Sequence, residues 1–177
     1  MRIAVLHREL GIPADYAQLR GLPLHAEADA AELVSIGEDI YGREQRLIRP
    51  AADAWHALRA AAEADGLALQ PVSAFRTVEY QAGIIRRKLA ASQPIDAILK
   101  VSAAPGYSEH HTGRALDVAT AGADPLEETF AKTPAFAWLQ QHAVAHDFRL
   151  SYPRDNPYGI AYEPWHWAWT PPDAEAP

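Results

Sequence analysis

The chain has 177 residues, the length of a single compact domain that can bury a hydrophobic core. Its formal net charge of −7, with no cluster of basic residues, excludes nucleic acid as a partner and favours a small-molecule or peptide substrate. There is no cysteine, which excludes disulfides, thiolate nucleophiles and cysteine-based zinc sites and leaves only histidines and carboxylates to bind a metal.

The N-terminal segment carries only a short apolar run, residues 3–6, before charged residues return. Because this run is too short for a signal-peptide core or a membrane span, we expect no membrane-spanning segment and a cytoplasmic protein. If the sequence is part of a longer chain, a periplasmic or cell-envelope location is expected instead. The run 3–6 is compatible with a short strand, and residues 27–33 have a helical composition without a clear apolar stripe.

The pattern is clearer after Pro50, where apolar residues recur at helical spacing as far as Gly66. Proline suits the first turn of a helix and glycine suits its end, so an amphipathic helix is predicted here. Residues 67–75 alternate between apolar and smaller or polar side chains and predict a strand, which Pro71 confines to a sheet edge or a bulge. Thr77 can cap the helix that follows.

Residues 114–120 are predicted to form a short strand, in which Leu116 and Val118 share one face and Asp117 points away from them. Residues 124–127 and the pair Thr133-Pro134 both resemble capped helix starts.

Two further strands are predicted at residues 148–152 and 160–169, and the proline-rich acidic end, residues 170–177, is predicted to be a flexible tail. The fold class predicted from this order is α+β.

Three segments carry polar groups where a core would need apolar ones: residues 73–81, 108–117 and 163–166. The middle segment places His110 on a glycine-containing loop and Asp117 on the strand that follows, which offers one nitrogen and one oxygen ligand. Without a cation, an ionised aspartate on a half-buried strand would be costly to desolvate. Catalytic zinc usually has three protein ligands and an open fourth position, and His166 is the best candidate for the third.

Glu163 precedes His166 by three residues and is predicted to act as the general base toward a zinc-bound water. In a fully extended strand these two side chains would face opposite sides, so Pro164 must mark a bend or a bulge. Arg76 lies where a strand gives way to a helix, and it could bind a substrate carboxylate or stabilise the oxyanion of the reaction.

Alternative interpretations apply to several of these residues. Arg76 could form a surface salt bridge with Glu79, and Gln81 could be an exposed helix residue. His111 is expected next to the metal site or at its rim rather than as a ligand. A nucleophilic role for Ser108 is disfavoured, because no Gly-x-Ser-x-Gly motif is present. The tryptophans of residues 165–169 recur with period two, which predicts one strand face packed on the core and, less readily, a wall of a substrate groove.

The motif Ser108-x-His110-x-x-Gly113-x-Ala115-x-Asp117, followed by Glu163-x-x-His166, resembles the VanY-type D-alanyl-D-alanine carboxypeptidases. The resemblance includes Ser73-Ala-Phe-Arg76 with Gln81 and spans roughly residues 47–169, although Ala74-Phe75 replaces the Gly-Tyr usual before this arginine.

The resemblance implies that His110, Asp117 and His166 bind one Zn²⁺, that Glu163 is the general base, and that Arg76, Gln81 and Ser108 contact the substrate. It also implies the fold of hedgehog domains and zinc DD-peptidases, with a small antiparallel sheet carrying the zinc site and helices packed on it. Residues 1–46 would then pack on or lead into the domain formed by residues 47–169.

The sequence therefore predicts a zinc carboxypeptidase that removes C-terminal D-alanine from peptidoglycan stem peptides, and we expect a monomer. A D,D-enzyme would act on pentapeptides, whereas an L,D-enzyme would trim tetrapeptides in cell-wall recycling. The alternative is a non-catalytic zinc-containing module that binds cell-wall peptide or a protein partner. Glu163 argues against this alternative, because a structural zinc site has no need of a carboxylate beside an open position.

Overall fold

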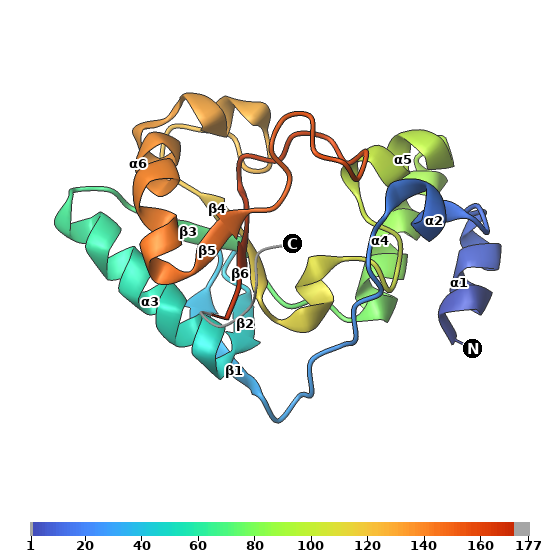
Figure 1. Cartoon of the computed structure of the whole chain (residues 1–177), viewed down its shortest axis with the longest axis horizontal. Coiled ribbons are helices and arrows are strands. Elements are labelled where there is room, and N and C mark those ends of the chain that lie inside the picture. The colour runs from blue at the N-terminus through green and yellow to red at the C-terminus, as the bar shows by residue number, and fades with distance from the viewer. Residues whose placement is uncertain (1, 172–177) are drawn as a thin grey trace.

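The computed structural model describes residues 2–171 of the chain (Figure 1). In chain order its helices and strands are α1 (Arg2–Leu10), α2 (Tyr16–Arg20), β1 (Leu33–Glu38), β2 (Glu44–Ile48), α3 (Arg49–Ala64), β3 (Gln70–Ser73), α4 (Val78–Ala90), α5 (Ile95–Val101), the 3-10 turn η1 (Glu109–Thr112), β4 (Ala115–Ala119), η2 (Glu128–Lys132), α6 (Pro134–His142), η3 (Ala143–His146), β5 (Phe148–Leu150) and β6 (His166–Trp169). This mixture of short antiparallel strands and helices confirms the predicted α+β class. Within residues 2–171, no helix combines the length and the apolar character of a membrane-spanning segment.

A four-stranded antiparallel sheet forms the centre of the fold, in the order β3-β4-β6-β5. Asp117 of β4 pairs with Ser73 of β3 on one side and with His166 of β6 on the other. Pro71 lies in β3 at the sheet edge, as predicted, because a residue without an N–H group cannot complete a ladder on both sides. The register therefore sets two of the predicted metal ligands directly opposite each other on neighbouring strands.

The two faces of this sheet serve different purposes. One face packs against α3 and α6 and buries Leu116, Val118 and Trp167 in the main hydrophobic core. A second core lies among α1, α2, α4 and α5, and Figure 1 shows this group of helices on the other side of the sheet from α3 and α6. Because side chains alternate along a strand, Asp117 points away from the main core. The sheet thus presents its polar ligands toward the space between the two groups of helices.

The predicted helices after Pro50 and Thr77 are confirmed. Pro50 lies in the first turn of α3, which ends just before Gly66. The Thr77 hydroxyl caps α4 by accepting a backbone N–H at 3.0 Å, and Thr133 caps α6 in the same way at 3.1 Å. The cap at Thr77 holds the backbone directly after Arg76 in place, so it also positions the backbone of Arg76, a candidate site residue.

The sequence left the N-terminal region open, with a pattern compatible with a strand at residues 3–6 and a helical composition at residues 27–33, and the structure shows neither that strand nor a helix at 27–33. Residues 3–6 are not a strand but part of α1, whose Leu6 and Leu10 share one helical face and are buried in the second core. The apolar run is too short to reveal its period, so packing against the other helices decides the structure. Residues 27–33 form no helix: Ala28 N donates to His111 O at 2.8 Å, in the loop that carries the candidate site, and Leu33 already begins β1.

The later part of the chain is less regular than predicted. The helix start expected at residues 124–127 is wrong: Leu126 has a positive φ of 59°, and only the 3-10 turn η2 follows. The strands expected at 148–152 and 160–169 shorten to β5 and β6, because the chain ahead of β6 turns. Of the predicted tail, residues 172–177 lie outside the described part of the chain, and Thr170 N donates to Asp147 O at 2.9 Å.

The hairpin of β1 and β2 was not predicted. It buries Ile36 and Leu47 in the main core, and its turn is closed by Asp39, whose buried carboxylate accepts four hydrogen bonds, from Tyr41 N, Arg43 N, Arg43 Nε and Gln45 Nε2. Backbone hydrogen bonds tie the hairpin to the chain around the edge strand β3, from Ile40 N to Pro71 O and from Phe75 N to Arg46 O. The hairpin therefore covers the exposed edge of the sheet and supports the loop that leads to Arg76.

Candidate metal centre and active site

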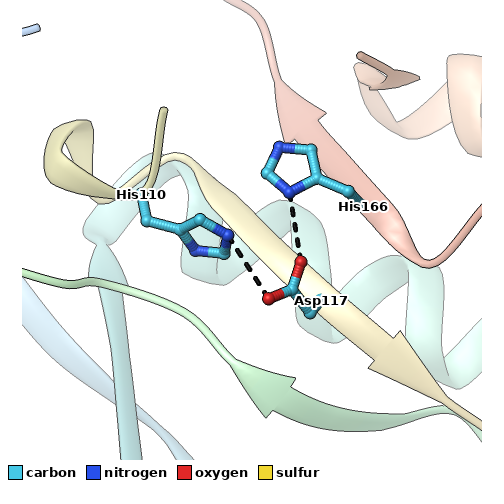
Figure 2. A group of neighbouring side chains, drawn as sticks. All are labelled: His110, Asp117 and His166. Carbon is cyan, nitrogen blue, oxygen red and sulfur yellow. Dashed lines mark hydrogen bonds and ion pairs between the residues drawn. The ribbon is translucent and has the colours of Figure 1, made fainter. Parts of the chain in front are cut away.

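The three predicted metal ligands converge at one point of the sheet (Figure 2). Asp117 projects from β4, His166 from the facing position of β6, and His110 from η1 just ahead of β4. Asp117 Oδ2 lies 3.4 Å from His110 Nε2, and Asp117 Oδ1 lies 3.1 Å from His166 Nδ1. One ligand atom from each of the three lies within 4.8 Å of the others, and all three residues are buried. The cluster has the composition and spacing of a site that can hold a metal ion.

Gly113 allows η1 to turn directly into β4, and so sets the distance between His110 and Asp117. Its φ is +65°, and a Cβ atom at this position would lie 3.0 Å from a Leu33 methyl carbon and 3.2 Å from Ile48 N. A residue with a side chain would be strained in this conformation and would press on β1 and on the junction of β2 with α3. The motif therefore needs glycine here.

Hydrogen bonds on the far side of each imidazole set which nitrogen faces Asp117. His110 Nδ1 lies 2.6 Å from Ala74 O, which can only accept, so Nδ1 carries the proton and Nε2 keeps a free lone pair. This Nε2 is buried and has no hydrogen-bond partner among the described residues. His166 Nε2 lies 2.8 Å from Glu109 Oε2, which leaves Nδ1 toward Asp117.

Two of the distances between these atoms are close to those expected around a zinc ion. Two ligand atoms that each lie about 2.0 Å from a tetrahedral zinc are about 3.3 Å apart. The separations of 3.4 Å from His110 to Asp117 Oδ2 and of 3.1 Å from His166 to Asp117 Oδ1 are close to this value. They end on different oxygens of the carboxylate, and one ligand atom from each of the three residues lies within 4.8 Å of the others.

The charges at the cluster also favour a cation. Burial alone would raise the pKa of Asp117, yet His110 and His166 hold the pKa of this carboxyl well below its usual range. Burial lowers the pKa of His110 to about 4, and the nearby charge of Arg76 acts in the same direction. For His166, burial is outweighed by the hydrogen bonds to Asp117 and Glu109, which raise its pKa to about 10. A buried, ionised carboxylate is stabilised by positive charge next to it, and a divalent ion bound between these side chains would supply that charge.

Glu163 lies beside the cluster, on the turn that enters β6. Its carbonyl accepts the N–H of His166 at 3.0 Å, which closes a turn across Pro164 and supplies the bend that the sequence required. Glu163 Oε2 lies 3.9 Å from His166 Nδ1, and the side chain is 12% exposed. Burial raises the pKa of Glu163 to about 7 against the opposing charge of His166. A carboxyl group with this pKa can take up and release a proton near neutral pH.

Arg76 reaches the same point from the loop between β3 and α4. Its Nη2 lies 3.9 Å from Asp117 Oδ2, and its Nε is buried with no hydrogen-bond partner among the described residues. The alternative pairing with Glu79 is not formed, because Glu79 contacts Arg2 and Arg86. Arg76 thus keeps donors available for an anion at the cluster.

A small cavity of about 40 Å³ adjoins the cluster and is lined by Arg76, Gln81 and Ser108 together with His110, Glu163 and His166. Gln81 is buried rather than exposed on its helix: its Nε2 donates to Ala103 O at 2.8 Å, and its Oε1 lacks a hydrogen-bond partner among the described residues. The structure therefore brings the three predicted substrate-binding residues to one cavity next to the predicted ligands.

A larger groove of about 500 Å³ is also lined by Arg76, Asp117 and Glu163. Its apolar lining comes from Ile84, Val101, Leu126, Tyr162 and Trp165, and its other charged residues are Lys88, Glu127 and Glu128. Glu163 belongs to the lining of both cavities, so a molecule that spans them would pass the Glu163 carboxylate.

The N-terminal segment holds the loop that carries Ser108 and His110. Four hydrogen bonds link the N-terminal segment to this loop. Two join backbone groups, from His25 N to Gly106 O and from Ala28 N to His111 O. The other two use side chains, from Ala104 N to Tyr16 Oη and between His7 Nε2 and Pro105 O. Gly106 has a φ of +90°, and a Cβ atom there would lie only 2.7 Å from the Ile3 Cδ1 atom. The segment before residue 47 is thus packed closely on the candidate site.

His111 supports this loop. Its Nδ1 donates to Arg76 O at 2.6 Å, and its Nε2 accepts from Gly106 N at 3.1 Å. Both ring nitrogens are therefore occupied by backbone groups, in keeping with the prediction that His111 lies beside the metal site without binding the ion.

The three tryptophans of residues 165–169 pack on the main core, as their spacing predicted. Trp167 is buried within it, whereas Trp165 and Trp169 are partly buried against it. Trp165 also lines the groove, because it belongs to the turn before β6 rather than to the strand.

Two neighbours of the cluster were not predicted. Glu109 hydrogen-bonds to His166, and the ring of the buried Tyr152 lies 4.9 Å from the His166 ring, centroid to centroid. Glu109 had a sequence signal, since it directly precedes a predicted ligand. Tyr152 had none, because only the path of the chain after β5 brings it to the site.

Residues 44–172 match the family described as VanY: D-alanyl-D-alanine carboxypeptidase. YodJ of Bacillus subtilis, which bears a carboxypeptidase name, is 34% identical over 127 residues, covering 70% of this chain and 46% of YodJ. The solved LdcB LD-carboxypeptidase is 28% identical, with a TM-score of 0.71 over 80% of this chain and 69% of that chain. A mutant of the vancomycin-resistance D,D-pentapeptidase VanY, solved with Zn(II), is 25% identical, with a TM-score of 0.63 over 84% of this chain and 82% of that chain. The chain spans less than half the length of the curated relatives that it matches.

Proposed function

Because the chain belongs to the VanY family of D-alanyl-D-alanine carboxypeptidases, we propose that it is a zinc carboxypeptidase that removes C-terminal D-alanine from peptidoglycan stem peptides. The observation that carries the proposal is the buried cluster of His110, Asp117 and His166, with Glu163 beside it in the lining of both cavities. The buried His110 Nε2, which has no hydrogen-bond partner within residues 2–171, and the ligand spacing support zinc as the ion.

Zinc at this cluster would polarise the scissile carbonyl group and make an attacking water more acidic. Glu163 would accept a proton from that water and deliver it to the leaving amine, the two tasks of a general base that later acts as an acid. Its pKa of about 7 suits both tasks, and its 12% exposed side chain is screened from bulk water.

The small cavity would receive the C-terminal residue. Its volume of about 40 Å³ makes it a small subsite, in keeping with a terminal residue as small as alanine. Arg76 has a buried Nε donor that is unpaired among the described residues and could bind a carboxylate, and Gln81 and Ser108 add polar groups to the lining of the same cavity. Arg76 would bind the terminal carboxylate of the substrate, or it would stabilise the negative charge that develops on the carbonyl oxygen.

The groove of about 500 Å³ would receive the part of the peptide that precedes the scissile bond. The relatives include an L,D-carboxypeptidase and a D,D-pentapeptidase, so both substrate classes remain within the proposal. The two classes differ in the residue before the terminal D-alanine, and this residue would lie in the groove.

Incubation of the zinc-loaded protein with muramyl tetrapeptide and with muramyl pentapeptide, followed by mass spectrometry, tests the proposal. Loss of D-alanine from the tetrapeptide alone would identify an L,D-enzyme, and loss from the pentapeptide alone a D,D-enzyme. Loss from neither peptide would contradict the proposed activity and favour a module that binds cell-wall peptide without hydrolysing it.

A further inference from the structure

Glu109 belongs to the same 3-10 turn as His110, yet its side chain contacts the other histidine of the cluster. It reaches from η1 to β6, where Oε2 lies 2.8 Å from His166 Nε2. The His166 side chain is 3% exposed and that of Glu109 is 27% exposed, so the contact is largely withdrawn from water. The four-residue turn η1 therefore contributes to both histidine ligands: it carries His110 itself, and its Glu109 carboxylate hydrogen-bonds to His166.

A histidine can bind a metal through either ring nitrogen, and the partner of the other nitrogen decides which one is used. An ionised carboxylate only accepts hydrogen bonds, so Glu109 requires the proton of His166 on Nε2. The remaining nitrogen, Nδ1, lies 3.1 Å from Asp117 Oδ1 and faces the predicted metal position.

The two histidines of the cluster have different outer partners. His110 is oriented by a neutral backbone carbonyl, Ala74 O, whereas His166 is oriented by a charged side chain. A carboxylate partner makes an imidazole a stronger electron donor than a carbonyl partner does. His166 is also the ligand whose place depends most on tertiary structure, because it lies far along the chain from His110 and Asp117.

We propose that Glu109 is a positioning residue of the metal site, which fixes the His166 ring so that Nδ1 and not Nε2 is presented to the ion. This proposal rests on the proposed zinc site. It assigns to Glu109 a contribution to metal affinity that is separate from the roles of the three ligands and of Glu163.

Zinc affinity, measured by competition with a chromogenic chelator at fixed pH, tests this assignment. Glu109→Ala should bind zinc about 10-fold to 100-fold more weakly than the wild type, the usual effect of removing an outer partner of a metal-binding histidine. Glu109→Gln, whose amide oxygen can still accept from Nε2 but carries no charge, should fall between the two. Glu127→Gln is the matched control, because it removes the same charge from the exposed groove wall and should keep the affinity of the wild type.

The melting temperatures of the metal-free variants show whether each is folded, and partial recovery in Glu109→Gln separates positioning from general damage. Wild-type affinity in Glu109→Ala would overturn the role of Glu109 while leaving the zinc site intact. A wild-type protein that binds no zinc would instead overturn the proposed metal site, and the positioning role with it.

Discussion

Replacement of Glu163 by glutamine should stabilise the metal-free protein above neutral pH. The structure buries this carboxyl group and raises its pKa from 4.5 to about 7, so the folded chain disfavours the ionised form that an unfolded chain would adopt. This difference corresponds to about 3 kcal/mol of lost stability once the group is ionised in both states. Glutamine has nearly the same shape and no charge, so Glu163→Gln should recover up to about this amount.

The pH dependence follows from the sign of the shift. Because the folded state holds the proton more tightly, the penalty is absent below pH 4.5, grows as the pH rises toward 7, and is complete above that value. Urea denaturation in the presence of a metal chelator, at pH 5 and at pH 8, measures this penalty as the difference in the free energy of unfolding between Glu163→Gln and the wild type. Glu127→Gln is the control for the loss of an exposed charge in the same groove. Equal stability of Glu163→Gln and wild type at pH 8 would refute the claim that burial at this site destabilises the ionised carboxylate.

Arg76→Lys should raise KM by about 10-fold to 100-fold with a smaller change in kcat if the guanidinium binds the substrate carboxylate, since lysine cannot reproduce its paired donors; steady-state kinetics checks this. The double variant His110→Ala, His166→Ala should lose stoichiometric zinc in elemental analysis, and full retention would contradict the ligand assignment. Asp39→Ala should lower the free energy of unfolding by about 2 kcal/mol at pH 7, because four hydrogen bonds to a buried carboxylate are lost. Hydrogen bonds from Arg43 and Tyr41 hold the pKa of Asp39 below 3.8 against its burial. The wild type should therefore lose its greater stability over Asp39→Ala only as the pH falls below 3.8, which acid titration of both proteins would show.

The candidate site was predictable to the extent that its residues lie in short motifs. His110 and Asp117 are joined by a turn whose shape depends on Gly113, so their spacing in the sequence reports their spacing in space. Glu163 and His166 are likewise joined by the turn at Pro164. Only the family resemblance implied that the two motifs meet at one ion. The pairing of β4 with β6, which brings them together, was not predicted, because strand register depends on contacts across the whole sheet.

The parts of the fold that the sequence did not reveal depend on tertiary contacts. The run that includes Leu6 is too short to show a helical period, and its helix is stabilised by the second core. The hairpin around Asp39 is stabilised by a network of side-chain hydrogen bonds, which a search for alternating apolar residues does not detect. Tyr152 reaches His166 only because the chain after β5 bends back over the site.

The most direct test of the central claim is a paired measurement on Glu163→Gln: its zinc content and its rate of D-alanine release from whichever muramyl peptide the wild type cleaves. We expect one bound zinc, as in the wild type, and a rate reduced by about 10²-fold to 10⁴-fold, since a general base is lost and the three metal ligands are kept. Hydrolysis at the wild-type rate with zinc in place would contradict the proposed mechanism.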